Sequence, residues 1–120
     1  MRSHESAEDY LEAILVIGRK RGAVRSVDVA NELGFSKPSV SVAMKKLRDA
    51  ASIETDADGF ISLTAEGLRL AERVYERHTL LTKWLSNLGV DPATAAEDAC
   101  RIEHVISEAS FTAIKKLVSP

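Results

Sequence analysis

Apolar residues recur every three or four positions over most of this chain, a spacing typical of amphipathic helices. The pattern predicts helices over residues 5–20, 26–33, 37–50, 64–88, 92–107 and 108–118. It breaks at two short segments, 53–55 and 60–63, which flank the turn sequence Asp56-Ala-Asp-Gly59 and so predict the two strands of a β-hairpin. The expected fold class is therefore mostly α, with one small sheet.

The segment 26–50 combines two short helices with a tight turn at Gly34-Phe35-Ser36, and the predicted hairpin follows it directly. Ser26 and Ser36 are the expected N-caps of the two helices. This order is that of a winged helix-turn-helix unit. The second helix carries small polar and basic side chains on its outer face, which suit contacts in a DNA major groove. The candidate DNA-binding residues are Ser36, Lys37, Pro38, Ser39, Ser41, Val42, Lys45 and Lys46. The alternatives are an ordinary helical hairpin, or a winged helix of an enzyme or of a protein-binding module.

The distribution of charge supports DNA binding more than the total charge does. The formal net charge is −2, which argues against a protein that is basic all over. Residues 19–48, however, hold eight lysines and arginines against two acids. Such a local excess attracts a phosphate backbone, although a solvated surface can look the same.

Composition limits the class of protein. A chain of 120 residues accommodates one or two small domains, and 45% hydrophobic with only 5% aromatic residues indicates an aliphatic, helical core. No apolar run approaches the ~18 residues that span a membrane. The N-terminal MRSHESAEDY is not an export signal, and the single cysteine excludes an intrachain disulfide. We therefore expect a cytoplasmic protein without membrane contacts.

A thiol, a carboxylate and an imidazole follow one another at Cys100, Glu103 and His104. In a helix this spacing places all three on one face, and divalent transition metals bind this mixture of ligands. Two acids on the first predicted helix and a histidine on the fourth could complete a site. The candidate metal ligands are Asp9, Glu12, His78, Cys100, Glu103 and His104. The alternative is that these are unrelated surface and core residues.

A second stripe on the predicted 92–107 helix consists of small and aliphatic residues. Ala95, Ala99, Ile102 and Ile106 are spaced by four, three and four positions, which is typical of a packing seam. On a small monomer this seam would be exposed unless it packed on a partner chain or on the last helix. We therefore predict these four residues as dimerisation residues.

With these residues identified, the chain resembles the iron- and manganese-dependent repressors of the diphtheria toxin repressor and manganese transport regulator type. The matching stretches are Ser6-Ala-Glu-Asp9-Tyr-Leu-Glu12-Ala-Ile, Val29-Ala-Asn-Glu-Leu, Ser36-Lys-Pro-Ser-Val40, Gly59-Phe-Ile-Ser-Leu-Thr64, Glu76-Arg-His78, Gly89-Val-Asp-Pro92 and Glu97-Asp-Ala-Cys-Arg-Ile-Glu-His104. The resemblance implies a metal-activated transcriptional repressor that binds a double-stranded DNA operator as a homodimer. It also implies an N-terminal winged helix-turn-helix domain over residues 1–75, followed by an α-helical metal-binding and dimerisation domain over 76–120.

Several positions depart from the family pattern. Cys100 stands where the manganese branch has a metal-bridging glutamate and matches the iron branch instead, which leaves Fe(II) or Mn(II) open, with Zn(II) or Co(II) as substitutes. Ala96 and Thr82 stand where the iron branch has ancillary ligands, so we expect that second site to be lost. Ala51 replaces a usual glycine, and because the sequence ends at Pro120 we do not expect an SH3-like third domain.

Two other functions stay open from the sequence. One is a winged-helix regulator that senses redox state through Cys100, or a small organic effector, rather than a metal. The other is a metal-dependent hydrolase, because carboxylate and histidine ligands also serve to activate water. No nucleophile or oxyanion motif supports the hydrolase, so we do not expect an enzyme.

Overall fold

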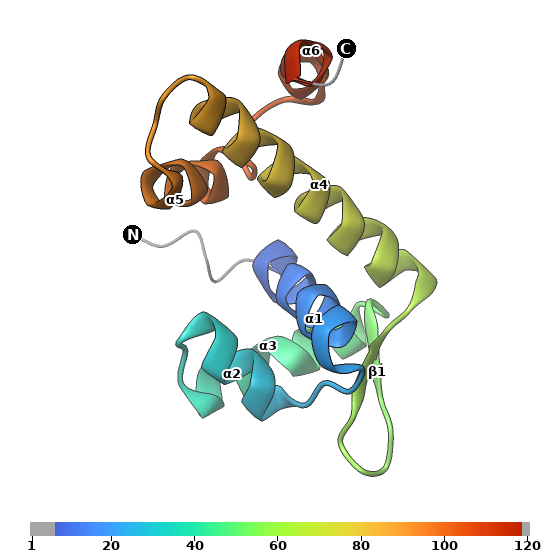
Figure 1. Cartoon of the computed structure of the whole chain (residues 1–120). Helices are drawn as coiled ribbons and strands as arrows, with labels where there is room; N and C mark the ends of the chain where they lie inside the picture. The colour runs from blue at the N-terminus through green and yellow to red at the C-terminus, as the bar shows by residue number, and fades with distance from the viewer. Residues whose placement is uncertain (1–6, 119–120) are drawn as a thin grey trace. The chain divides into compact units, whose positions relative to one another are not determined.

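The computed structural model describes residues 7–118 and divides them into two compact units, one ending at Glu72 and the other beginning at Arg73 (Figure 1). The elements are α1 (Ala7–Arg21), α2 (Ser26–Leu33), α3 (Lys37–Asp49), β1 (Ile53–Thr55), β2 (Ile61–Leu63), α4 (Ala65–Asn87), α5 (Pro92–Ile102) and α6 (Glu108–Val118). The predicted mostly α fold is confirmed. The first residues of the predicted 5–20 helix, Glu5 and Ser6, lie outside the described residues. No described helix has the length and apolar character needed to cross a membrane.

The first unit is built on a core shared by α1, α2, α3 and the hairpin. Leu11, Val29, Val40 and Met44 are almost completely buried in one apolar cluster. The hairpin pairs β1 with β2 in antiparallel register, with Ile53 opposite Leu63. The backbone N–H of Ile61 also donates to the carbonyl of Val24, at 2.8 Å, and ties the wing to the segment before α2. The predicted helix-turn-helix and wing are both present.

Helix starts in this unit follow capping chemistry, with one correction. Ser36 caps α3 as expected, because its hydroxyl accepts a hydrogen bond from the backbone N–H of Ser39 at 3.2 Å. Ser26, which we expected to cap α2, is instead its first helical residue. The cap position is Arg25, whose backbone N–H donates to the Asp28 carboxylate at 2.9 Å. An acid three residues into the helix replaces the serine cap.

The turn after α3 keeps the geometry that a glycine would have. Ala51 has a φ of 61°, the one positive value among the described residues other than glycine. The turn is held from α4, since the Thr64 hydroxyl donates to the Ala51 carbonyl at 2.7 Å and accepts from the Gly67 N–H at 3.1 Å. Gly67 lies so close to Ser52 that an added Cβ would stand 1.9 Å from the Ser52 carbonyl oxygen. Neighbouring contacts therefore impose a left-handed conformation on an alanine.

We predict that Ala51→Gly stabilises the protein by roughly 0.5–1 kcal/mol. The left-handed conformation destabilises a residue other than glycine by about 1–2 kcal/mol, and the glycine variant is relieved of this strain. The greater freedom of glycine in the unfolded chain offsets about 0.4–1 kcal/mol of the relief. Denaturant unfolding of both proteins measures the difference. Ala50→Gly is the control. Ala50 has a φ of −82°, which alanine adopts without strain, so this variant should be less stable than wild type. Equal changes in the two variants would contradict the strain at Ala51.

The second unit packs α4, α5 and α6 around an apolar cluster of Leu80, Leu81, Ala99 and Phe111. Asp91 caps α5 and accepts a hydrogen bond from the Thr94 backbone N–H at 3.1 Å. Hydrogen bonding to the side chain and backbone of Thr94 lowers the pKa of Asp91 below its usual value. The lowered pKa favours the ionised form of the cap, which is the better hydrogen-bond acceptor.

Two predictions about α5 need correction. The helix ends at Ile102 and not at residue 107, since a turn separates it from α6. The predicted dimerisation seam is largely covered by its own chain. Ala95 and Ala99 have no exposed surface, so they cannot contact a partner in this conformation. Ile102 and Ile106 are partly buried against the same cluster as Phe111 of α6. A seam of small residues packs equally well inside one chain as between two chains.

Candidate metal centre

The C-terminal end of α5 brings three predicted ligands together. Cys100 lies in the last turn of the helix, Glu103 follows as its capping residue, and His104 lies in the turn beyond. Each of the three offers a ligand atom, and these atoms lie within 4.8 Å of one another. The spacing of Cys100, Glu103 and His104 predicted that they lie close together, and they do so even though the helix stops before Glu103.

Glu103 is the most informative of these residues because its side chain is completely buried. Neither carboxylate oxygen accepts a hydrogen bond from any residue that the structure describes. Its Oε1 atom lies 3.3 Å from Nδ1 of His78 on α4. A buried carboxylate without hydrogen bonds is strongly destabilising, and a bound cation relieves this cost. The thiol, carboxylate and two imidazoles of this unit therefore fit a divalent transition metal.

The two remaining predicted ligands belong to the first unit. Asp9 and Glu12 lie on α1, three positions apart and so on one side of the helix. Asp9 is buried, whereas Glu12 is partly buried. A buried aspartate on a helix that also supplies the core is unusual unless it binds a partner group. Their participation in the centre is taken up as a proposal below.

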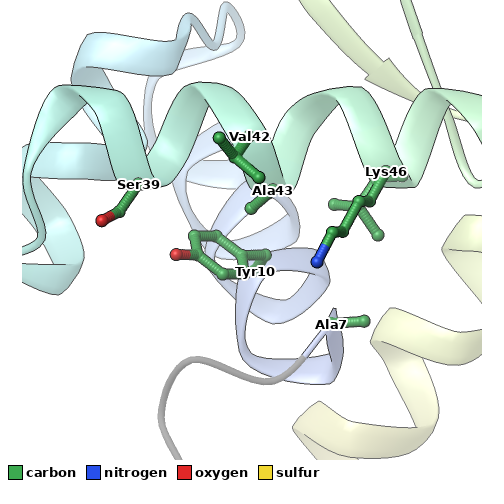
Figure 2. A pocket seen from close by; sticks show the side chains of 7 residues that line it. Ala7, Tyr10, Ser39, Val42, Ala43 and Lys46 are labelled. Carbon is green, nitrogen blue, oxygen red and sulfur yellow. The ribbon is translucent and has the colours of Figure 1, made fainter.

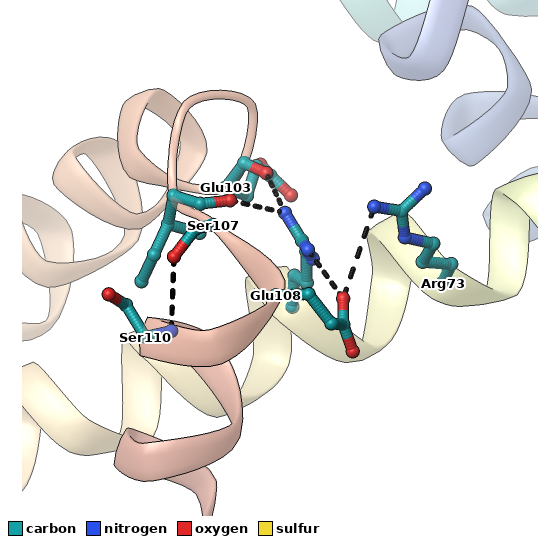
Figure 3. A network of polar contacts seen from close by, with 7 residues as sticks. Arg73, Glu103, Ser107, Glu108 and Ser110 are labelled. Carbon is teal, nitrogen blue, oxygen red and sulfur yellow. Dashed lines mark hydrogen bonds and ion pairs between the residues drawn. The ribbon is translucent and has the colours of Figure 1, made fainter.

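A buried arginine beside the centre has no counterpart in the sequence analysis. Arg77 precedes His78 on α4, and its Nη1 donates to the backbone carbonyls of Glu103, at 3.1 Å, and Ile106, at 3.0 Å. Its Nη2 donates to the Glu108 carboxylate at 2.8 Å. Figure 3 shows this network, with Arg73 reaching the same carboxylate from the side. The family match at Glu76-Arg-His78 includes this arginine, but its role could not be inferred from sequence because most of its acceptors are backbone carbonyls.

The candidate DNA-binding residues all lie on exposed positions in or just before α3. The opposite side of the helix, with Val40, Met44 and Leu47, is buried in the core. Val42 stands out as an exposed apolar side chain, and Lys45 forms only an exposed ion pair with Asp49 at 3.2 Å. Basic and small side chains thus project from a helix that is held rigidly from behind.

A pocket of about 410 Å³ lies beside this face. Figure 2 shows Ser39, Val42 and Lys46 of α3 on one side of it and Tyr10 of α1 on the other. The Tyr10 ring is buried and also packs against Phe35, with ring centroids 5.9 Å apart. Tyr10 follows Asp9 directly in α1, so this helix carries candidate metal ligands and also supports α3.

Comparison with known proteins fits both units. Residues 3–58 match the iron dependent repressor N-terminal DNA binding domain, and residues 64–120 match the metal binding and dimerisation domain of the same repressors. The transcriptional regulator MntR of Escherichia coli is 39% identical over 111 residues, which cover 92% of this chain and 72% of the relative. The chain belongs to the iron-dependent repressor family. The MntR of Listeria monocytogenes is 38% identical over 94% of this chain and 80% of its own length.

Solved structures of the family agree with the fold. The manganese regulator SloR superposes with a TM-score of 0.84 at 27% identity, over 93% of this chain and 53% of that protein. The metal-dependent regulator MtsR gives a TM-score of 0.87 at 27% identity, over 95% of this chain and 54% of its own. The chain therefore spans about half the length of these solved regulators. Its winged helix and its helical second unit are the parts that are shared.

Proposed function

We propose that this protein is a metal-activated repressor that binds operator DNA as a homodimer in the cytoplasm and controls genes of metal homeostasis. The observation that carries the proposal is the buried Glu103 carboxylate, which has no hydrogen-bond donor in the described residues and lies among a thiol and two imidazoles. That centre lies in the same chain as an exposed, basic recognition helix. The proposed domains are residues 1–75 for DNA binding and 76–120 for metal binding and dimerisation.

The proposed ligand set joins the two units. His78, Cys100, Glu103 and His104 would hold the metal from the second unit, while Asp9 and Glu12 would bind it from α1. A bound Fe(II) or Mn(II) ion, or Zn(II) or Co(II) in its place, would supply the positive charge that these acidic ligands require. Ligands on two units favour one arrangement of the units over others, because only that arrangement completes the coordination. A ligand shifts a conformational equilibrium only through such a difference in affinity.

Activation by metal is tested by measuring operator binding while Mn(II), Fe(II) and Zn(II) are titrated separately under anaerobic conditions. Candidate operators come from the DNA upstream of the protein's own gene and of metal-transport genes in the same genome. We expect affinity to rise with at least one metal and to fall again when a chelator is added. Metal-independent binding that changes with thiol oxidation would instead favour the redox regulator. The same assay with added small organic molecules tests the other alternative, a regulator that responds to an organic effector. Operator binding that changes with such a molecule and not with metal would favour it.

We predict that Lys45→Ala and Lys46→Ala each weaken operator binding and reduce its dependence on salt. If each lysine neutralises one phosphate, the slope of log affinity against log salt should fall by about 1 per lysine. Titrations at several salt concentrations give the slope. Lys116→Ala is the control, because it removes one exposed lysine from α6. A slope that is unchanged in both α3 variants would mean that this helix does not face DNA.

We also predict a dimer, although not through the buried seam. A groove of about 300 Å³ runs between α4 and α6, lined by Tyr75, Leu80 and Val118 among others, and Leu117 next to it is exposed. A twofold interface on this side would provide two recognition helices for a palindromic operator. Analytical ultracentrifugation at micromolar protein with metal should show twice the mass of the chain, and Leu117→Asp should shift it toward one chain. A wild-type protein that stays monomeric would contradict the prediction.

A further inference from the structure

The turn between α5 and α6 carries two of the proposed ligands, yet it has little regular structure of its own. Glu103 and His104 lie where α5 has ended, and α6 begins only at Glu108. The last carbonyl groups of a helix have no partner within it, so such turns need outside donors. In this turn Arg77 is that donor. Its guanidinium bonds the carbonyls of Glu103 and Ile106 and the side chain of Glu108.

The environment of Arg77 suits a rigid clamp. Its side chain is only 7% exposed, and its guanidinium lies 5.3 Å from the centre of the Phe111 ring. Hydrogen bonds from a charged donor are stronger than those between neutral groups, and burial strengthens them further. The planar fork of arginine reaches several acceptors at fixed angles, which the single ammonium of lysine does not. The Arg77 bonds from α4 therefore add to the two backbone hydrogen bonds by which Val105 and Ile106 hold the turn to the Ile102 carbonyl.

We propose that Arg77 is a positioning residue for the metal centre. It fixes the backbone from Glu103 to Ile106 so that the Glu103 carboxylate and the His104 imidazole are already placed before a divalent transition cation binds. Since His78 is the next residue on α4, the same helical turn supplies both a ligand and the clamp. The bond from Arg77 to Glu108 also ties the first residue of α6 to the same guanidinium. The inference rests on the metal centre of the proposed function.

The effect on metal binding follows from preorganisation. Without Arg77, the turn would have to become ordered when the cation binds, and that entropy cost would reduce affinity. Partners that orient metal ligands typically contribute a roughly 10–100-fold effect on metal affinity. We therefore expect Arg77→Gln to weaken Co(II) binding by about 10-fold or more within this range. Arg77→Lys keeps the positive charge but loses the planar guanidinium, so its Co(II) affinity should also be lower than that of wild type.

The test uses the full chain and Co(II), whose absorption reports coordination directly. Wild type should show a thiolate charge-transfer band from Cys100 and visible bands that reflect the ligand geometry. In the Arg77 variants the visible bands should change, which a purely structural defect at a distance would not produce. Hydrogen exchange on the metal-free protein is the second measurement. The N–H groups of Val105 and Ile106, both bonded to the Ile102 carbonyl, should exchange faster in the variants.

Arg73→Gln is the matched control. Arg73 lies one helical turn earlier on α4, is half exposed, and reaches Glu108 at 4.0 Å without bonding the turn's backbone. Its Co(II) spectrum, affinity and exchange should equal those of wild type. Wild-type spectra and exchange in the Arg77 variants would overturn the inference, as would equal losses in Arg73→Gln.

The outcomes also separate this inference from the proposed function. If wild type with Co(II) shows no thiolate charge-transfer band, the proposed metal centre itself is contradicted, independently of the results for Arg77. If neither Arg77 variant folds, Glu108→Gln decides, because the Glu108 side chain is 71% exposed and its loss leaves the core intact. That variant weakens one of the three bonds and should loosen the turn and lower Co(II) affinity in part. Unchanged exchange and affinity in Glu108→Gln would then overturn the role of the clamp.

Discussion

Glu103→Gln is expected to abolish the response of operator binding to metal while leaving the metal-free protein at least as stable as wild type. The amide has nearly the shape of the carboxylate but carries no charge, so it is a poor ligand for a divalent cation. The loss of affinity should exceed the roughly 10–100-fold effect of residues that only orient ligands. Stability should not fall, because the substitution removes a buried charge that has no hydrogen-bond donor in the part of the chain described.

The two effects are measured separately. Thermal or denaturant unfolding in chelator gives the stability of the metal-free state, and metal titration of operator binding gives the response. Glu97→Gln is the control, since Glu97 is an exposed residue of α5 that pairs with Arg101 at the surface. It should change neither measurement. A Glu103→Gln protein that still responds to metal at wild-type concentrations would show that Glu103 is not a ligand.

The sequence predicted much of the fold because its signals are local. Helical periodicity, the cap at Ser36 and the hairpin turn each depend on residues close together in the chain. The end of α5 was mispredicted for a physical reason. Ile106 continues the apolar spacing of the helix, but it reaches the cluster around Phe111 from the turn after Ile102. Periodicity records which side chains are buried and not whether the backbone between them is helical.

The same distinction explains what was found at the site and what was missed. Cys100, Glu103 and His104 were recognisable because the residue types themselves carry the chemistry. Arg77 was not, because two of its partners are backbone carbonyls that any residue would offer. Whether Asp9 and Glu12 join the other ligands depends on how two units are arranged, which no local pattern encodes. Long-range polar contacts to backbone are therefore the part of such a site that needs a structure.

Cys100 is expected to set the metal preference of the centre. A thiolate is softer than the carboxylate that it replaces, and borderline metals bind it more strongly than Mn(II) does. Wild type should therefore bind Fe(II), Co(II) or Zn(II) more tightly than Mn(II). Because the thiol must lose its proton to bind, affinity should rise with pH until the thiol is ionised. Isothermal titration in buffers of different ionisation enthalpy counts the protons released.

Cys100→Glu is the decisive comparison. A carboxylate is a hard ligand and can bridge two cations, so the variant should gain affinity for Mn(II), should lose the thiol-linked pH dependence and should have room for a second ion. Mn(II) titration followed by electron paramagnetic resonance gives both affinity and stoichiometry. Cys100→Ser controls for loss of the thiol alone and should weaken all the metals. If wild type binds two Mn(II) per chain as tightly as Cys100→Glu does, the cysteine does not set the preference.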